Sequence, residues 1–206
     1  GGGGRAAGGA PRPTGGRAPY AGPVDQATAV PARTVIIATG AEYRRPMLDR
    51  LTDFEGAGVY YGATSIERQL CAGEEVIVVG GGNSAGQAAV FLAETVRRVH
   101  LLVRSGGLAQ SMSRYLIRRI EENPKIELHA RTEIVALEGE THLERVRWRN
   151  TQTNEEVTRP ISHVFVMTGA VPNTRWLEGC LALDAKGFIK TGPDLSPDDL
   201  AAARWP

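Results

Sequence analysis

The sequence predicts a three-layer α/β fold that combines a parallel sheet with an antiparallel β-meander. Two observations predict it. Between residues 74 and 123, short apolar runs alternate with segments of helical periodicity, in the order strand, helix, strand, helix. Between residues 126 and 169, four β-like runs follow one another, and the middle two alternate apolar and polar residues. Hydrophobic residues make up 42% of the chain, which is enough to fill a globular core.

Composition excludes several classes of protein. The 206 residues include 24 basic and 23 acidic side chains, a net charge of +1, so no broad positive field is available for a nucleic acid. No apolar run reaches the roughly 18 to 20 residues of a membrane-spanning helix. Cys71 and Cys180 match no metal or disulfide spacing, which favours a reduced, cytoplasmic location.

The first 65 residues are expected to carry little regular structure. Residues 1–30 are mostly Gly, Ala, Pro and Arg, and we expect a disordered leader. An RNA-binding Gly/Arg arm is the alternative, although three arginines and one tyrosine form a weak electrostatic footprint. RTVIIATG, residues 33–40, is typical of a buried strand that ends on a glycine. Residues 41–65 indicate a linker.

The parallel part is predicted from four segments. EEVIVVGGG (74–82) and VHLLVRS (99–105) are expected to form strands, each followed by a helix, over 84–96 and 111–123. Asn123-Pro124 should end the second helix. Two apolar stripes predict the buried helix faces: Ala85, Ala89, Leu92 and Val96 in the first, and Met112, Leu116 and Ile120 in the second.

Four β-like runs follow, at 126–132, 133–139, 143–151 and 161–169. The middle two have the alternation of antiparallel strands with one wet face, whereas HVFVMTG (163–169) is typical of a buried strand. From Thr191 onward, turn residues and a short Ala/Arg segment indicate no further sheet.

A glycine-rich turn connects the first predicted strand of the parallel part to its helix. Gly80, Gly82 and Ala85 satisfy G-x-G-x-x-A, and this strand–turn–helix context is the one that dinucleotide binding requires. The helix dipole and the amides around Gly81, Asn83 and Ser84 would hold a pyrophosphate. The alternative is a glycine-rich turn without a ligand, as in any α/β protein.

The end of the next strand predicts which nucleotide binds. An NAD site has an acidic residue here, whereas an NADP site has arginine. HLLVRSGG contains no carboxylate, so we predict NADPH, with Arg104 pairing the 2′-phosphate and Ser105 donating a hydrogen bond. Arg114 could join them, or could belong to a solvated helix face with Arg118 and Arg119. The missing carboxylate also disfavours a methyltransferase.

The histidines suggest no further site. His100, His129, His142 and His163 are scattered over predicted strands and a loop without paired spacing, so no catalytic or metal-binding role is assigned to them, and no metal is expected.

Six ordered motifs are similar to those of one family: VIIATG, GVYYGATS, VIVVGGGNSA, HLLVRS, VMTGAVPNT and GFIKTG. Over residues 33 to about 195 they resemble the thioredoxin reductase family of two-dinucleotide flavoproteins, especially its members without a dithiol. The resemblance implies an NADPH domain inserted into an FAD domain, hydride transfer from NADPH to FAD and then to an acceptor, and a homodimer.

The resemblance also implies roles for two turns. Ala38, Thr39 and Gly40 would lie against the FAD. The turn formed by Gly169, Pro172, Asn173 and Thr174 would close the NADPH domain, with Gly169 near the cofactor.

Two departures from the family pattern modify the expected function. Gly62-Ala63-Thr64-Ser65 stands where the reductases have a C-A-T-C pair, so no disulfide can form there, and the acceptor should not be a dithiol. Cys71 has no partner nearby in sequence. The second departure is that the family's first G-x-G-x-x-G motif and its C-terminal GD motif are both missing from this sequence.

The expected organisation has four parts: a leader (1–30), a remnant of an FAD domain with one partial strand and a linker (31–58), an NADPH-binding domain of Rossmann-like fold (59–188), and a truncated return to the FAD domain (189–206). The function expected is that of an NADPH-dependent flavoprotein oxidoreductase with an unknown non-dithiol acceptor. The alternative is a fragment that only binds NADPH, without catalysis.

Overall fold

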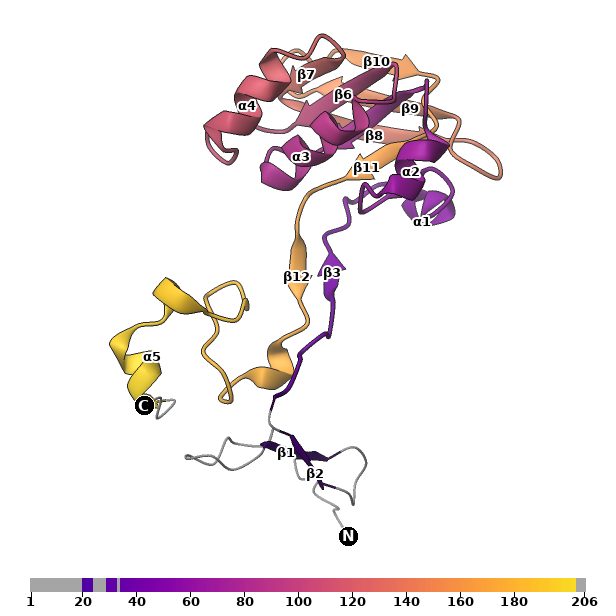
Figure 1. The fold of residues 1–206 in the computed structure, drawn as a ribbon. Coiled ribbons are helices and arrows are strands. Elements are labelled where there is room, and N and C mark those ends of the chain that lie inside the picture. The colour runs from indigo at the N-terminus through magenta and orange to yellow at the C-terminus, as the bar shows by residue number, and fades with distance from the viewer. Residues whose placement is uncertain (1–19, 24–28, 33, 203–206) are drawn as a thin grey trace. The chain divides into compact units, whose positions relative to one another are not determined.

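The computed structural model describes residues 20–23, 29–32 and 34–202 (Figure 1). Most of the expected disordered leader lies outside these residues. The chain divides into two compact units. One comprises Tyr43–Gly169, and the other combines Gly1–Glu42 with Ala170–Pro206. In the described part of the chain, no helix is long and apolar enough to cross a membrane.

A five-stranded parallel sheet forms the centre of unit Tyr43–Gly169. Its strand order is β4-β11-β5-β6-β7. The middle strand, β5, pairs in parallel with β11 on one side and β6 on the other, which confirms the predicted parallel sheet. The strands are β4 (Val59–Tyr60), β5 (Glu75–Val79), β6 (Arg98–Val103), β7 (Ile126–Ala130) and β11 (Val164–Val166).

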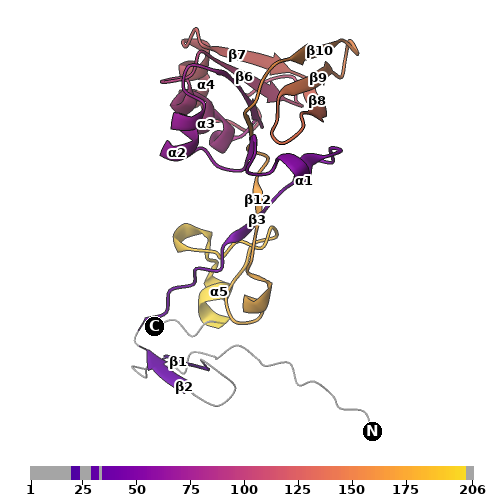
Figure 2. The same cartoon turned by 90° about the vertical axis from the view of Figure 1, so that its right-hand side faces the viewer.

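Helices α3 (Asn83–Leu92) and α4 (Arg114–Glu121) cover one face of this sheet (Figure 2). Both predicted apolar stripes are buried in one core with the strands. Gly86 lets the two helices approach each other, because a Cβ there would lie 2.8 Å from the sulfur of Met112. Helix α2 (Ser65–Leu70) precedes β5 and has no fully buried residue.

The meander covers the opposite face of the sheet (Figure 2). It has three strands in the order β10-β9-β8, whose bounds are β8 (Thr132–Glu138), β9 (Arg145–Asn150) and β10 (Glu156–Arg159). The antiparallel pairing of β8 and β9 was predicted, whereas β10 was not. The sequence of β10, EVTR, is mostly exposed and has no apolar alternation to reveal it.

The segment expected to be a linker contributes to the meander-side core. Helix α1 (Leu51–Phe54) buries Leu51 and Phe54 there, and β4 forms an edge of the parallel sheet. A helix forms where a linker was expected, because two apolar side chains three positions apart suffice to pack one helical turn against a core. So short a period carries no signal in the sequence.

The other unit contains short elements only. β1 (Tyr20–Pro23) pairs with β2 (Ala29–Ala32), which the composition of the leader did not predict. β3 (Ala41–Tyr43) pairs with β12 (Ala170–Pro172). Two 3₁₀ helices, Arg175–Leu177 and Gly192–Asp194, and helix α5 (Pro197–Ala202) complete it.

The strand expected within residues 33–40 does not form. Val35 and Ile36 are exposed, and no described strand pairs with this segment. A β-branched run needs a neighbouring strand to satisfy its backbone groups. The strand instead begins at Ala41, where β12 supplies that partner.

Candidate functional site

The glycine turn after β5 requires glycine at its first position. Gly80 has φ of +142°, a conformation that residues with a Cβ rarely adopt. A Cβ on Gly80 would lie 2.5 Å from the carbonyl oxygen of Met167 and 3.1 Å from the Cβ of Ala85. The amide of Gly80 donates to the Leu102 carbonyl at 3.0 Å. The turn is therefore packed between β11, β6 and α3.

The first turn of α3 follows directly. Gly82 is the N-cap residue and supplies no side-chain hydrogen bond to the helix amides. Asn83 and Ser84 are exposed, whereas Ala85 is fully buried against the sheet. An N-cap without a side chain leaves amides of the first turn accessible to an external acceptor, and the helix dipole favours an anion there. This arrangement suits a phosphate.

The loop after β6 borders the same turn. The Ser111 hydroxyl donates to the Gly81 carbonyl at 2.8 Å, and the Ser113 amide donates to Oδ1 of Asn83 at 2.8 Å. A Cβ on Gly81 would lie 3.8 Å from Oγ of Ser105. The end of β6 and the glycine turn are therefore adjacent, as a dinucleotide site requires.

Arg104 and Ser105 differ in their availability for a phosphate. Arg104 is exposed, and it makes no ion pair within the part of the chain that the structure describes. The Ser105 hydroxyl donates to the Gly107 carbonyl at 2.7 Å, so its proton already has an acceptor. Arg104 is consequently the stronger candidate of the two for binding a phosphate.

Arg131 is a candidate that the sequence did not reveal. It directly follows β7, and its backbone amide donates to the Ser105 carbonyl at 2.9 Å. A Cβ on Gly106 would lie 3.2 Å from a guanidinium nitrogen of Arg131. Arg131 could have been found only from the order of the strands, because the carboxyl ends of neighbouring parallel strands lie at the same edge of the sheet.

The remaining predicted contacts to NADPH occupy separate elements. Arg114 is the first residue of α4 and is exposed. Gly169 has φ of +92°, and its carbonyl accepts a hydrogen bond from the Arg44 amide at 2.9 Å. Met167, whose carbonyl contacts the Gly80 position, lies two residues earlier. The structure thus brings β11 to the glycine turn, and contact of Gly169 or Arg114 with a cofactor stays a prediction.

The position of the family's redox pair is occupied by a helix start. Ser65 is the first residue of α2, and Thr64 caps it through a capping box with Glu67. Gly62 has open space where a side chain would stand. Neither Gly62 nor Ser65 has a sulfur atom, so these positions carry no thiol chemistry.

Cys71 is a core residue. It is fully buried at the end of α2, and burial raises the pKa of its thiol to about 11. The thiolate is the reactive form of cysteine, so this sulfur is a poor nucleophile at neutral pH. Cys71 therefore packs as a small apolar residue of this core.

In the folded chain, Cys71 is expected to react with thiol reagents much more slowly than the half-buried Cys180. Ellman's reagent at about pH 8 should give one faster and one slower phase, and both thiols should react quickly in denaturant. In Cys71→Ser the faster phase should persist. A Cys71→Ser variant that loses the faster phase would show the assignment to be reversed.

The turn expected against the FAD contacts the turn expected to close the NADPH domain. The Thr39 hydroxyl donates to the Asn173 carbonyl at 2.9 Å, and Nδ2 of Asn173 donates to the Thr39 carbonyl at 3.1 Å. The Asn173 amide also donates to the carbonyl of Gly40, which has φ of +70°. Ala38, Thr39 and Gly40 are exposed, although the carbonyls of Thr39 and Gly40 accept hydrogen bonds from Asn173.

Comparison with known proteins decides the family. A model described as pyridine nucleotide-disulphide oxidoreductase matches residues 16–199, most of the chain. The chain belongs to this family. It is 34% identical over 159 residues to the thioredoxin reductase of Mycolicibacterium smegmatis, covering 77% of this chain and 50% of that protein.

Two further relatives and one solved structure are also similar to this chain. NADPH-dependent thioredoxin reductase 3 of Arabidopsis thaliana is 34% identical over 78% of this chain and 30% of its own length. An NADH dehydrogenase of Bacillus subtilis is 31% identical over 77% and 30%. The crystal structure of Lactococcus lactis thioredoxin reductase superposes with a TM-score of 0.70 at 21% identity, covering 89% of this chain and 59% of that one.

These comparisons confirm the predicted resemblance and the Rossmann-like α/β fold. The chain spans about half or less of the length of these curated relatives.

Proposed function

We propose that this chain is the NADPH-binding part of an FAD- and NADPH-dependent oxidoreductase of the thioredoxin reductase type. NADPH supplies a hydride, and FAD receives it and passes electrons to an acceptor other than a dithiol. The observation that carries the proposal is the turn at Gly80–Gly82, which is packed on the Met167 carbonyl and opens onto the first turn of α3.

The residues around this turn suit NADPH. Gly82 leaves amides of α3 open to a pyrophosphate, and Gly81 lies against Val103 at the end of β6 and against Ser111 in the loop before α4. Arg104 and Arg131 flank Ser105 and provide two positive charges where a 2′-phosphate would bind. The absence of a carboxylate in residues 104–107 favours NADPH over NADH.

For FAD, the support is family membership and the turn at Ala38–Gly40, held by Asn173. This turn alone is a small part of a flavin site. The acceptor is proposed to lack a dithiol because Gly62 and Ser65 occupy the place of the redox pair. A homodimer is proposed from the family resemblance alone.

Nucleotide binding and flavin reduction test the proposal separately. The full chain is titrated with NADPH by isothermal calorimetry, and one molecule of NADPH is expected per chain. The same protein is then mixed anaerobically with FAD and NADPH, while the visible flavin absorbance is followed.

The outcomes distinguish the two readings of the chain. Bleaching of flavin by NADPH only when the chain is present would support an oxidoreductase. NADPH binding without bleaching would favour the alternative, a non-catalytic NADPH-binding module. A chain that binds neither NADPH nor NADH would overturn both, because each depends on the glycine turn.

A further inference from the structure

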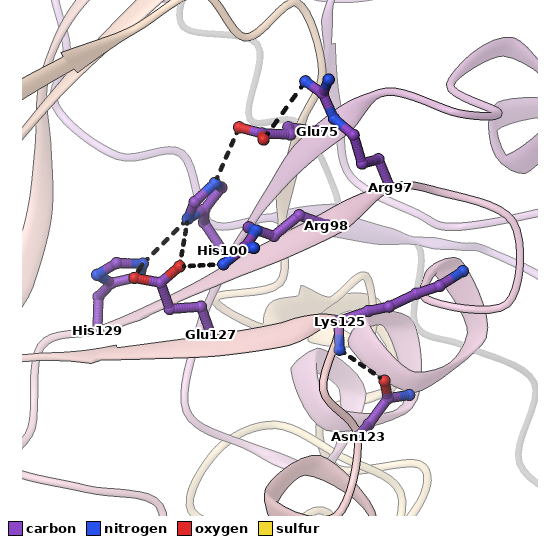
Figure 3. Close-up of polar contacts among 8 residues, drawn as sticks. All are labelled: Glu75, Arg97, Arg98, His100, Asn123, Lys125, Glu127 and His129. Atoms are coloured by element: carbon purple, nitrogen blue, oxygen red, sulfur yellow. Dashed lines mark hydrogen bonds and ion pairs between the residues drawn. The ribbon is translucent and has the colours of Figure 1, made fainter.

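Two histidines that are far apart in sequence lie in contact on the meander side of the parallel sheet (Figure 3). His100 on β6 is paired in register with Glu127 on β7, and His129 follows Glu127 by two residues. Residues two apart in a strand share a face. The sequence has no paired histidine spacing, and the register of the parallel strands brings these side chains together.

Three potential ligand atoms converge in this cluster. Nδ1 of His100 lies 3.1 Å from Nε2 of His129 and 3.8 Å from Oε2 of Glu127. Nε2 of His129 lies 3.5 Å from Oε1 of Glu127. In a tetrahedral zinc site with bonds of about 2.0–2.1 Å, neighbouring ligand atoms are about 3.3 Å apart. The observed separations of 3.1, 3.5 and 3.8 Å lie on both sides of that value, and the two histidines contact different oxygens of the Glu127 carboxylate.

The neighbouring carboxylate orients the first ligand. Oε2 of Glu75 lies 3.3 Å from Nε2 of His100, and the other oxygen of Glu75 is paired with Arg97 (Figure 3). A proton on Nε2 shared with a carboxylate leaves the lone pair on Nδ1, the atom that faces His129 and Glu127. Histidine ligands of metals commonly donate their other nitrogen to a carboxylate in this way.

The second carboxylate is also held in place. Arg98 donates from Nη1 to Oε2 of Glu127 at 2.9 Å, so this side chain is fixed beside the histidines. Trp148 of β9 covers them, with ring centroids 5.4 Å from His100 and 5.7 Å from His129. The side chain of His100 is 4% exposed, whereas that of Glu127 is 46% exposed. The cluster therefore has an apolar wall and an open side for entry.

We propose that His100, His129 and Glu127 bind one divalent metal ion of the zinc class. Two imidazoles and a carboxylate are a ligand set that zinc accepts, and a fourth position on the Glu127 side would hold water. Binding requires the His129 tautomer that carries its proton on Nδ1, because Nε2 of His129 must offer its lone pair to the ion. The ion links β6 to β7 under Trp148, in a part of the domain that the proposed hydride transfer does not use.

Metal binding is measured on the full chain after treatment with a chelator. Calorimetric titration with Zn²⁺ is expected to give one ion per chain, and Co²⁺ should produce the intense visible absorption of a tetrahedral site with nitrogen and oxygen ligands. His129→Gln and Glu127→Gln should each weaken Zn²⁺ binding at least about tenfold, because each removes one of three ligands. Circular dichroism checks that both variants are folded.

His142→Gln is the matched control, because His142 is exposed and lies outside the cluster. It should bind Zn²⁺ as the unmodified chain does. Glu75→Gln should weaken affinity about tenfold while the Co²⁺ absorption keeps its form, because Glu75 positions a ligand without being one. If His129→Gln does not fold, Glu127→Gln at the open side still tests whether loss of a ligand weakens Zn²⁺ binding. Absence of saturable binding, or unchanged affinity in a folded ligand variant, would overturn the proposal.

Discussion

Gly80→Ala is expected to lower the free energy of unfolding by about 2–4 kcal/mol, the largest effect of any single methyl group near the site. Two causes add. The backbone at Gly80 has φ of +142°, which alanine adopts only with strain, and the new Cβ would lie 2.5 Å from the Met167 carbonyl oxygen. Met167 directly follows β11, and its amide donates to the Val79 carbonyl at 2.8 Å, so its backbone cannot move away cheaply. Urea unfolding followed by circular dichroism measures the change.

Gly82→Ala is the matched control, two residues along the same turn. Gly82 has φ of −92°, and the nearest atom to its Cβ position is the Ser111 carbonyl oxygen at 4.0 Å. In Gly82→Ala the free energy of unfolding should fall by about 1 kcal/mol or less, the range for an alanine at an N-cap. NADPH affinity should nevertheless decrease, because a methyl group there obstructs the approach of a pyrophosphate. Equal losses of stability in the two variants would contradict the separate roles of these glycines.

The parts of the fold that the sequence predicted are those with long periodic signals. The stripe through Ala85, Ala89 and Leu92 is buried as expected, because a helix against a sheet repeats its buried face every three to four residues. The run EVIVV forms the central strand, because both of its faces are covered. Among the missed elements, α1, β4 and β10 are too short or too exposed to show a period.

The predicted nucleotide site depended on local sequence, and this limits what could be foreseen. The turn from Gly80 to Ala85 is contiguous, so its strand–turn–helix context could be read directly. Arg131 comes from a different strand, and it reaches Ser105 only through the parallel register of β6 and β7. His100 and His129 meet for the same reason. Contacts across a sheet become visible only when the strand order is known.

The strand expected within residues 33–40 shows the opposite limit. Its β-branched residues have the right propensity, but propensity for a strand reflects packing against neighbours. Val35 and Ile36 are exposed, so no packing supports a strand there. Local preference was outweighed by the lack of a partner among the described strands.

Arg104→Ala is expected to weaken NADPH binding by about 10- to 100-fold and to leave NADH binding unchanged. A hydrogen bond to a charged group contributes about 1.5–3 kcal/mol, and about 1.4 kcal/mol corresponds to a tenfold change in affinity. Only NADPH carries the 2′-phosphate that the Arg104 guanidinium would pair. The measurement is a calorimetric titration of each variant with both nucleotides, at one fixed salt concentration because screening weakens exposed pairs.

Two further substitutions separate a local contact from a general positive field. Arg131→Gln removes the second charge beside Ser105 and should also weaken NADPH selectively, by a smaller factor because Gln152 already accepts a hydrogen bond from Arg131. Arg118→Ala removes an exposed charge on α4 that is paired with Glu122, and both affinities should stay unchanged. Equal loss of NADPH and NADH affinity in Arg104→Ala would contradict the assignment of Arg104 to the 2′-phosphate. A loss in Arg118→Ala as large as that in Arg104→Ala would show that net charge, and not position, controls binding.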